Sequence, residues 1–404
     1  MPKYFFTARS RQGQPYSGTQ EAKNEHELAR ALREEGYVLI SASPEEEKGK
    51  LEFSIPFFSR VSFKDKMMLA KNLQVMIGAG VSLPNALKTL AEQTKSRKLK
   101  KILLEIAQDV IKGKSFSESL SRYPNVFSEL FCSMVKIGEE SGTLEENLAV
   151  LSRQMRREYE LGSKIKGALM YPAVIILAMV GIGIMMLIVV VPKLSETFRE
   201  LEIELPLTTK LVIGFGNFLA DKWYLVALFF IIMFFLGRLA LKTKQGKKIV
   251  SILAIRTPIV SQLIKKTNSA YTVRTLSSLL SAGVPLVRSL EIIADTLGNF
   301  YFKKAIRDSL EQVRKGSKLS EALKPYANLY SVSVIQMIRV GEETGETSDV
   351  LAKLGDFFEE EVTNTTKNLA SIIEPILMLL IGGVVGFFAI SMIQPMYSML
   401  GGIE

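Results

Sequence analysis

Two long runs of the chain carry no charged side chain. Gly167 to Pro192 comprises 26 uncharged residues, and Pro375 to Ile403 comprises 29. As a helix the first run extends about 39 Å, which exceeds the roughly 30 Å hydrocarbon core of a bilayer. The pattern therefore predicts two transmembrane helices.

A third run is shorter. Only the 15 residues from Trp223 to Gly237 are uncharged, about 22 Å of helix, and a buried helix of a soluble core is the alternative. We favour a span, because Leu239 to Leu241 continue the apolar run and Arg238 can extend its charge toward the headgroups. Trp223 and Tyr224 are typical of a membrane interface.

The basic residues set the expected orientation. From Gly237 to Lys266 there are eight basic residues and no acidic one, whereas Lys193 to Asp221 holds three basic and five acidic residues. Because lysine and arginine accumulate in cytoplasmic loops, we expect the segment 193–221 outside and both large polar regions inside. The net charge of +10 then reflects topology, and we expect no direct nucleic-acid partner.

The chain contains an internal repeat. Ala79-Gly80-Val81 corresponds to Ala282-Gly283-Val284, a shift of 203 residues, and Gly138 to Gly142 corresponds to Gly341 to Gly345 at the same shift. Pro172 likewise corresponds to Pro375. Lys112 to Leu120 corresponds to Lys315 to Leu323 as the fourth block in this register. The four blocks keep the register without a gap, which indicates a duplicated unit of cytoplasmic helices followed by its own span.

Each copy has the pattern of a bundle of six helices. In the first copy Lys66 to Met76 and Pro84 to Ala91 flank a glycine turn, and apolar residues between Leu99 and Val110 repeat with helical spacing. Capping boxes are expected at Ser115 and Thr143. The last helix of each copy runs to a proline, which predicts membrane-entry hinges at Pro172 and Pro375.

The first 44 residues differ from the rest. Lys3 to Ala8, Pro15 to Glu21 and Tyr37 to Ser41 have strand patterns, and Glu25 to Glu35 has a helical one. A small α+β module is expected here. Glu45 to Lys50 is rich in charge and predicts a solvated linker.

The expected fold class is an all-α integral membrane protein with two homologous cytoplasmic six-helix bundle domains, three transmembrane helices and a small α+β N-terminal module. Its parts are a ββαβ adaptor at 1–44, a linker at 45–61, cytoplasmic domain 1 at 62–170, a span at 171–192, an extracytoplasmic loop at 193–221, a span at 222–241, cytoplasmic domain 2 at 242–373, a span at 374–397 and an extracytoplasmic tail at 398–404.

Composition argues against catalysis. The chain has one histidine, His26, and one cysteine, Cys132, so a zinc site or a Cys–His nucleophile has too few side chains. No phosphate-binding loop of the Gly-x-x-x-x-Gly-Lys-Ser/Thr type is present. We expect no enzyme activity, no catalytic residue and no cofactor.

The repeated acidic pairs, Glu139-Glu140 and Glu342-Glu343, allow three interpretations. They can form a polar face at a helix end, present carboxylates to a partner, or bind a divalent ion at an interface. Adjacent carboxylates on a helix diverge by about 100 degrees and rarely converge on one metal. The candidate partner-binding residues are Gly138, Glu139, Glu140, Gly142, Gly341, Glu342, Glu343 and Gly345.

These motifs resemble a known family. The Ala-Gly-Val turns, the Gly-Glu-Glu-Ser/Thr-Gly blocks and Lys164 to Pro172 entering a span are similar to the inner-membrane platform proteins of type II secretion and type IV pilus systems, called GspF and PilC. The resemblance covers essentially the whole chain. The second copy departs from the first by having Glu374 before Pro375 where the first has Tyr171 before Pro172.

The resemblance implies a platform in the bacterial inner membrane that couples a cytoplasmic assembly ATPase to the polymerisation of pilin or pseudopilin subunits. Implied partners are that hexameric ATPase, a retraction ATPase and other inner-membrane assembly proteins. Type IV pilus biogenesis is preferred, and type II secretion is the alternative.

An alternative of another class is a small oligomeric channel or transporter. Apart from Arg238 near an end, the expected spans carry no buried charge, and ion pathways usually do. Small-residue faces such as Gly382-Gly383 with Gly386 favour helix packing between subunits. We therefore expect a homo-oligomer, with a dimer as the simplest case.

Overall fold

The computed structural model describes residues 3–10, 15–22, 25–44, 61–200 and 207–400. The chain divides into two compact units, residues 1–60 and 61–404. The expected linker at 45–61 lies outside the described residues except for residue 61, and so does the end of the expected tail.

The amino-terminal unit is a three-stranded antiparallel sheet with one helix. Its elements are β1 (Lys3–Ser10), β2 (Pro15–Glu21), α1 (Glu25–Glu34) and β3 (Tyr37–Pro44). The strand order is β2-β1-β3, so the first strand is central. Phe6 and Ala8 from β1 are buried with Leu28 and Leu32 from α1, because alternate strand positions and one helix face meet.

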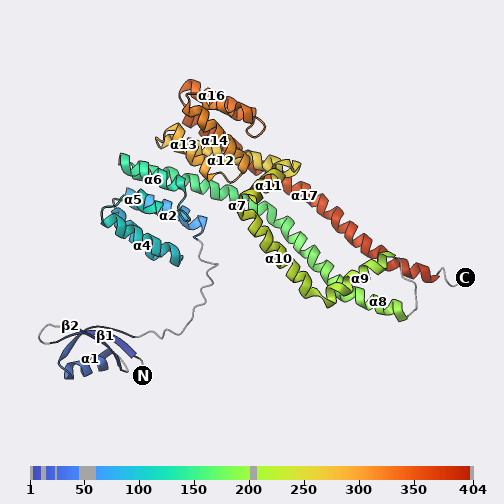
Figure 1. The fold of residues 1–404 in the computed structure, drawn as a ribbon, viewed down its shortest axis with the longest axis horizontal. Coiled ribbons are helices and arrows are strands. Elements are labelled where there is room, and N and C mark those ends of the chain that lie inside the picture. The colour runs from blue at the N-terminus through green and yellow to red at the C-terminus, as the bar shows by residue number, and fades with distance from the viewer. Residues whose placement is uncertain (1–2, 11–14, 23–24, 45–60, 201–206, 401–404) are drawn as a thin grey trace. The chain divides into compact units, whose positions relative to one another are not determined.

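The second unit is helical throughout its described part (Figure 1). The first copy comprises α2 (Phe63–Gly78), α3 (Leu83–Gln93), α4 (Arg97–Ile111), α5 (Phe116–Ser121), α6 (Glu129–Ser141) and α7 (Leu144–Met185). A π-helical turn (Met186–Val190), α8 (Val191–Glu200), α9 (Leu207–Asp221), α10 (Trp223–Lys242) and α11 (Lys244–Arg256) follow.

The second copy comprises α12 (Pro258–Ser281), α13 (Leu286–Thr296), α14 (Phe300–Arg314), α15 (Leu319–Leu323), the 3-10 turn Lys324–Tyr326, α16 (Val332–Thr344) and α17 (Thr347–Leu400). The bounds of α3, α4 and α6 reappear 203 residues later in α13, α14 and α16. The expected mostly helical fold with two tandem domains is confirmed. In the described chain α11 has no counterpart in the first copy.

Local signals explain most of these boundaries. Ser62 and Asp65 form a capping box at the start of α2, and the Ser115 hydroxyl accepts the Glu118 N–H at the start of α5. The capping box expected at Thr143 is wrong, because that side chain makes no cap hydrogen bond. The Thr143 hydroxyl instead accepts from the Asn147 amide at 2.9 Å.

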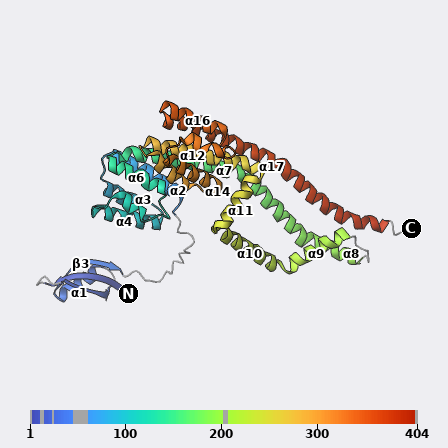
Figure 2. The same ribbon diagram turned by 45° about the horizontal axis from the view of Figure 1, so that its top comes forward.

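Among the residues that the structure describes, two helices are long and apolar enough to cross a membrane. They run within Leu144–Lys193 and Thr347–Ser391, and a third candidate is the bent pair Thr209–Leu219 and Trp223–Leu239, with 80° between its helices. Figures 1 and 2 show α7 and α17 leaving the bundles and running the same way. The described part of the chain thus has two such helices, or up to three if the bent pair is one span.

The segment 193–221, expected as an extracytoplasmic loop, contains the whole of α9. The Thr209 hydroxyl donates to the Ser391 carbonyl of α17 at 2.6 Å. Val212 and Ile213 are buried against Val191. Therefore α9 connects the far ends of the two long helices.

Candidate functional site

The two Gly-Glu-Glu-Ser/Thr-Gly blocks occupy the same place in each copy. Gly142 and Gly345 end α6 and α16 with φ values of 72° and 78°. This left-handed conformation favours glycine. The block is therefore a helix end followed at once by the long helix to the membrane.

The first acid of each block has an intramolecular partner. The Glu139 carboxylate accepts the N–H of Phe116 at 2.6 Å and that of Ser117 at 3.0 Å. The Ser117 hydroxyl also donates to it, at 2.8 Å. Because these N–H groups lie at the start of α5 and lack helical partners, Glu139 caps that helix.

The second copy repeats this arrangement. The Glu342 carboxylate accepts the N–H of Leu319 at 2.6 Å and that of Ser320 at 3.2 Å. Each position is 203 residues beyond its counterpart. The first acid of each block thus ties α6 to α5, or α16 to α15.

The second acid of each block faces solvent. Glu140 lies 3.7 Å from the Lys136 amine, and Glu343 accepts from Arg339 at 2.8 Å. The Arg339 hydrogen bond lowers the pKa of the exposed Glu343 carboxyl. Exposed ion pairs one helical turn apart contribute little stability, so these two carboxylates are the accessible members of the blocks.

The glycine before each acidic pair lies against the next helix. A Cβ on Gly138 would approach the Leu144 Cα to 2.8 Å, and one on Gly341 would approach the Thr347 Cα to 2.9 Å. Both contacts are with backbone, which cannot move aside easily. The glycines therefore allow each short helix to pack tightly on the long one.

Among the described residues, no three His, Cys, Asp or Glu side chains lie close enough together to hold a metal ion. Glu139 and Glu342 accept backbone N–H groups. Glu140 and Glu343 pair with basic side chains.

The candidate hinges lie inside continuous helices. α7 includes Pro172 among its 42 residues, and α17 includes Pro375 among its 54. Pro172 is buried and Pro375 is exposed. The helices continue through both prolines, and the hinge role stays a prediction.

Sequence reasoning missed a cavity of about 360 Å³ between the two copies. It opens between α7 and α12, and its lining includes Glu158, Tyr271 and Gly298. Loss of hydration raises the pKa of Glu158 to about 7, against attraction from Lys66. Glu158 is nevertheless an exposed residue, so the water that it retains opposes this rise of its pKa.

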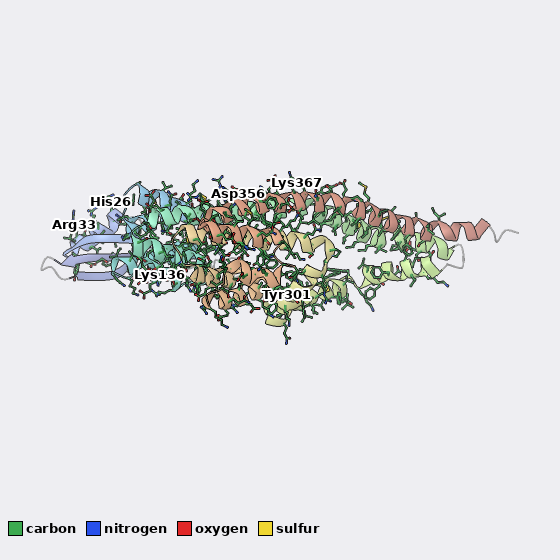
Figure 3. All side chains as sticks on the ribbon, turned by 90° about the horizontal axis from the view of Figure 1, so that it is seen from above. His26, Arg33, Lys136, Tyr301, Asp356 and Lys367 are labelled. Atoms are coloured by element: carbon green, nitrogen blue, oxygen red, sulfur yellow. The ribbon has the colours of Figure 1, made fainter. Side chains whose placement is uncertain are left out.

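Four charged side chains join the copies beside this cavity. Arg157 of α7 binds Asp356 of α17, and Arg274 of α12 binds Glu359 at 2.8 Å and also Asp356. Figure 3 labels Asp356 on α17. Desolvation opposes ionisation of Asp356, but hydrogen bonds from Arg274 and Arg157 outweigh it and lower its pKa.

The polar contacts between copies continue along α7. The Gln154 amide donates to the Thr275 hydroxyl at 3.1 Å, and its oxygen accepts from Ser278 at 3.1 Å. Glu129 of α6 pairs with Arg288 of α13. Because these partners lie more than 120 residues apart, no local sequence signal could have identified them.

Comparisons with known proteins cover the whole chain. The profile of the family described as type II secretion system protein F matches residues 69–192 and again residues 272–395. The profile of that protein's N-terminal domain matches residues 1–43. The two long matches have the same 203-residue offset as the repeat.

The chain is similar to proteins of two machines. It is 34% identical over 403 residues to a type IV pilus assembly protein PilC of Thermus thermophilus, covering 99% of each chain. It is 29% identical over 404 residues to a PilC of Myxococcus xanthus, covering 100% of this chain and 96% of that one. A type II secretion system protein F of Aeromonas hydrophila is 30% identical over 379 residues, covering 93% of this chain and 97% of that one.

The duplicated helical copies, the long helices that leave them and the full-length matches agree. This chain belongs to the type II secretion system protein F family, which includes the PilC proteins of type IV pilus assembly.

Proposed function

We propose that this chain is an inner-membrane platform protein of a type IV pilus or type II secretion machine. The observation that carries the proposal is the similarity over 99% of the chain to a protein named for type IV pilus assembly. The platform couples a cytoplasmic assembly ATPase to the polymerisation of pilin or pseudopilin subunits. It acts by transmitting force and not as an enzyme.

The proposed membrane arrangement has three spans, at 171–192, 222–241 and 374–397. Large apolar side chains along α10 are exposed, among them Phe229, Phe234 and Leu236, and lipid would cover them. The basic residues that follow α10 favour a cytoplasmic position for the segment after this helix. The amino terminus is then cytoplasmic and the carboxyl terminus extracytoplasmic.

The long helices give a route for motion. α7 spans about 63 Å and α17 about 81 Å as continuous rods, so a displacement of either bundle moves its span. Pro172 and Pro375 each remove one backbone donor from these rods, which makes them the places where bending costs least.

The proposed partner surface is the accessible part of the two acidic blocks, Glu140 and Glu343 with the glycines that end α6 and α16. Carboxylates on both bundles suit basic side chains of an ATPase. The amino-terminal module at 1–44 and a second copy of the chain are further proposed contacts.

Type II secretion is the second candidate function. It is supported by the protein F of Aeromonas hydrophila, 30% identical to this chain over 93% of its length. The type IV pilus is preferred because the identity to the Thermus protein is 34%. Counting surface pili and secreted substrates in a strain lacking this chain separates the two.

A double variant tests the partner surface. Glu140→Ala with Glu343→Ala should reduce co-purification of the assembly ATPase and piliation while leaving the melting temperature nearly unchanged. Glu160→Ala, an exposed acid paired with Arg156 at 2.8 Å, is the matched control. Unchanged ATPase binding would remove these carboxylates from the proposal, and ion flux through the purified protein in liposomes would favour a channel.

A further inference from the structure

The two copies contact each other asymmetrically. The first copy uses α6 and α7, and the second uses α12 and α13 together with α17. A two-fold arrangement would also pack α2 on α17 and α3 on α16. Among the described residues no hydrogen bond or ion pair joins those helices. The contact is therefore of the head-to-tail kind, in which two different faces meet.

A head-to-tail contact leaves one face of each kind unused. The first copy has its own equivalent of the α12 and α13 face, formed by α2, α3 and the adjoining part of α7. The second copy has its own equivalent of the α6 and α7 face, formed by α16 and α17. We propose that a second copy of this chain docks there, with α16 and α17 of one chain against α2 and α7 of the next.

Two of the three residues at the centre of the proposed contact are apolar. Within the chain Gln154 bonds to Thr275 and Ser278. At the 203-residue shift Phe357 is the equivalent of Gln154. The equivalents of its partners Thr275 and Ser278 are Asn72 and Val75. Phe357 is 53% exposed and Val75 is 54% exposed. Covering both would remove apolar surface from water.

Three of the four charged side chains around this centre have equivalents of opposite sign at the 203-residue shift, whereas the equivalent of Arg274 is Lys71, which stays basic. Within the chain Arg157 of the first copy meets Asp356 and Glu359 of the second. Glu360 replaces Arg157 at the shift. Arg153 is the equivalent of Asp356, and Arg156 is the equivalent of Glu359. Both faces are therefore complementary again, with Glu360 of one chain meeting two arginines of the next.

The sign reversal also specifies which faces meet. If the α7 face of one chain docked on the free first-copy face of another, Arg157 would meet Arg153 and Arg156. Like charges in such a contact disfavour it. Only the second copy of one chain and the first copy of another bring opposite charges together, which keeps the order head-to-tail.

At the rim an ion pair is replaced by two uncharged residues. Glu129 and Arg288 pair across the internal contact, and their equivalents are Val332 and Asn85. Val332 is 58% exposed. The long helices of both copies run the same way (Figures 1 and 2). A further chain added by this rule would therefore keep its spans parallel to the first.

Cysteine cross-linking tests the contact in the full-length chain in membranes. In a Cys132→Ala background, Val75→Cys is placed in one tagged chain and Phe357→Cys in a differently tagged chain. A short bismaleimide should link the two tags. The control Gln154→Cys with Ser278→Cys should link within one chain and give no dimer.

A charge exchange sharpens the test. Glu360→Arg should reduce the cross-linked fraction by about threefold or more, and adding Arg153→Glu with Arg156→Glu to the other chain should restore it. The internal Gln154–Ser278 link reports whether each variant still folds. The proposal would be overturned if the only cross-linked products joined position 357 of one chain to position 357 of another. It would also be overturned if positions 75 and 357 did not link while the internal control at positions 154 and 278 did.

This inference rests on the duplication and not on the proposed function. The cross-link is measured without ATPase or pilin, so its failure would leave the platform role untouched. Conversely, a chain that forms the link but supports neither piliation nor secretion would contradict the platform role alone.

Discussion

Glu139 and Glu140 are neighbours in the chain, yet a helix turns about 100 degrees between them. One carboxylate therefore reaches the start of α5, at 2.6 Å from the Phe116 nitrogen. The other lies beside Lys136 in solvent. The same division holds for Glu342 and Glu343, so each pair has one acid for folding and one available to a partner.

Removing the folding acid should destabilise the first copy. Glu139→Ala leaves the Phe116 and Ser117 N–H groups without their acceptor, at a cost of about 1–3 kcal/mol. Thermal melting of the detergent-purified chain should show a lower midpoint. Glu140→Ala is the control and should melt close to the original protein; equal shifts for both variants would contradict the division of roles.

Glu158 should make stability depend on pH. Its pKa is raised in the folded chain to about 7 from the ordinary 4.5, so the folded state holds the proton more tightly than the unfolded state. Stability from this group is then present below about pH 4.5 and decreases as pH rises toward 7. Glu158→Gln should melt higher than the original protein at pH 8 and about equally at pH 4.5.

The control for this pH dependence is Glu160→Gln, an acid two residues along the same helix that does not line the cavity. It loses the ion pair with Arg156 and should show no gain at high pH. A pH-independent difference between Glu158→Gln and the original protein would show that the Glu158 carboxyl does not titrate in this range.

At the scale of elements, short helices dock on long ones through glycine. The end of α6 passes so close to the start of α7 that Gly138 has no room for a methyl group. The repeat made this glycine noticeable in the sequence. The sequence could not show why glycine is needed there, because the reason is the close approach of the α6 backbone to the α7 backbone.

Gly138→Ala should therefore be costly. A Cβ at 2.8 Å from the Leu144 Cα forces the two helices apart, at about 1–3 kcal/mol. Gly162→Ala on α7 is the matched control, because a Cβ there meets no atom within 4 Å and alanine favours helix by roughly 0.5–1 kcal/mol. Melting of both variants should show shifts of opposite sign.

At the scale of the whole molecule, the middle membrane segment decides the topology. α10 has 20 residues from Trp223 to Lys242, and α9 precedes it at a bend of 80°. If α10 spans as proposed, residues on its two sides face different compartments. α9 then lies at the outer side, where Thr209 contacts Ser391 of α17.

Labelling of single cysteines tests that topology. In a Cys132→Ala background, Asp221→Cys should react with an impermeant maleimide added to intact spheroplasts, and Lys244→Cys should react only after lysis. Cys132 itself is buried and burial raises the pKa of its thiol, so the original protein should label weakly. Protection of both new cysteines until lysis would contradict the second span.

Local patterns determined the helical elements and their register in the two copies. The 203-residue repeat, the turn glycines and the apolar spacing predicted boundaries that recur in α13, α14 and α16. These signals act over a few residues, because capping, left-handed turns and helix periodicity depend on near neighbours. For the same reason the long apolar runs could be recognised without a structure.

Contacts between distant residues decided the rest. The tertiary structure assigned Glu139 to α5, placed the Arg157–Asp356 pair between the copies and packed α9 against α17. Each of these contacts joins residues far apart in the chain, and sequence spacing does not indicate which distant residues come into contact. The two copies share one sequence pattern, and only their packing showed that they meet through different faces.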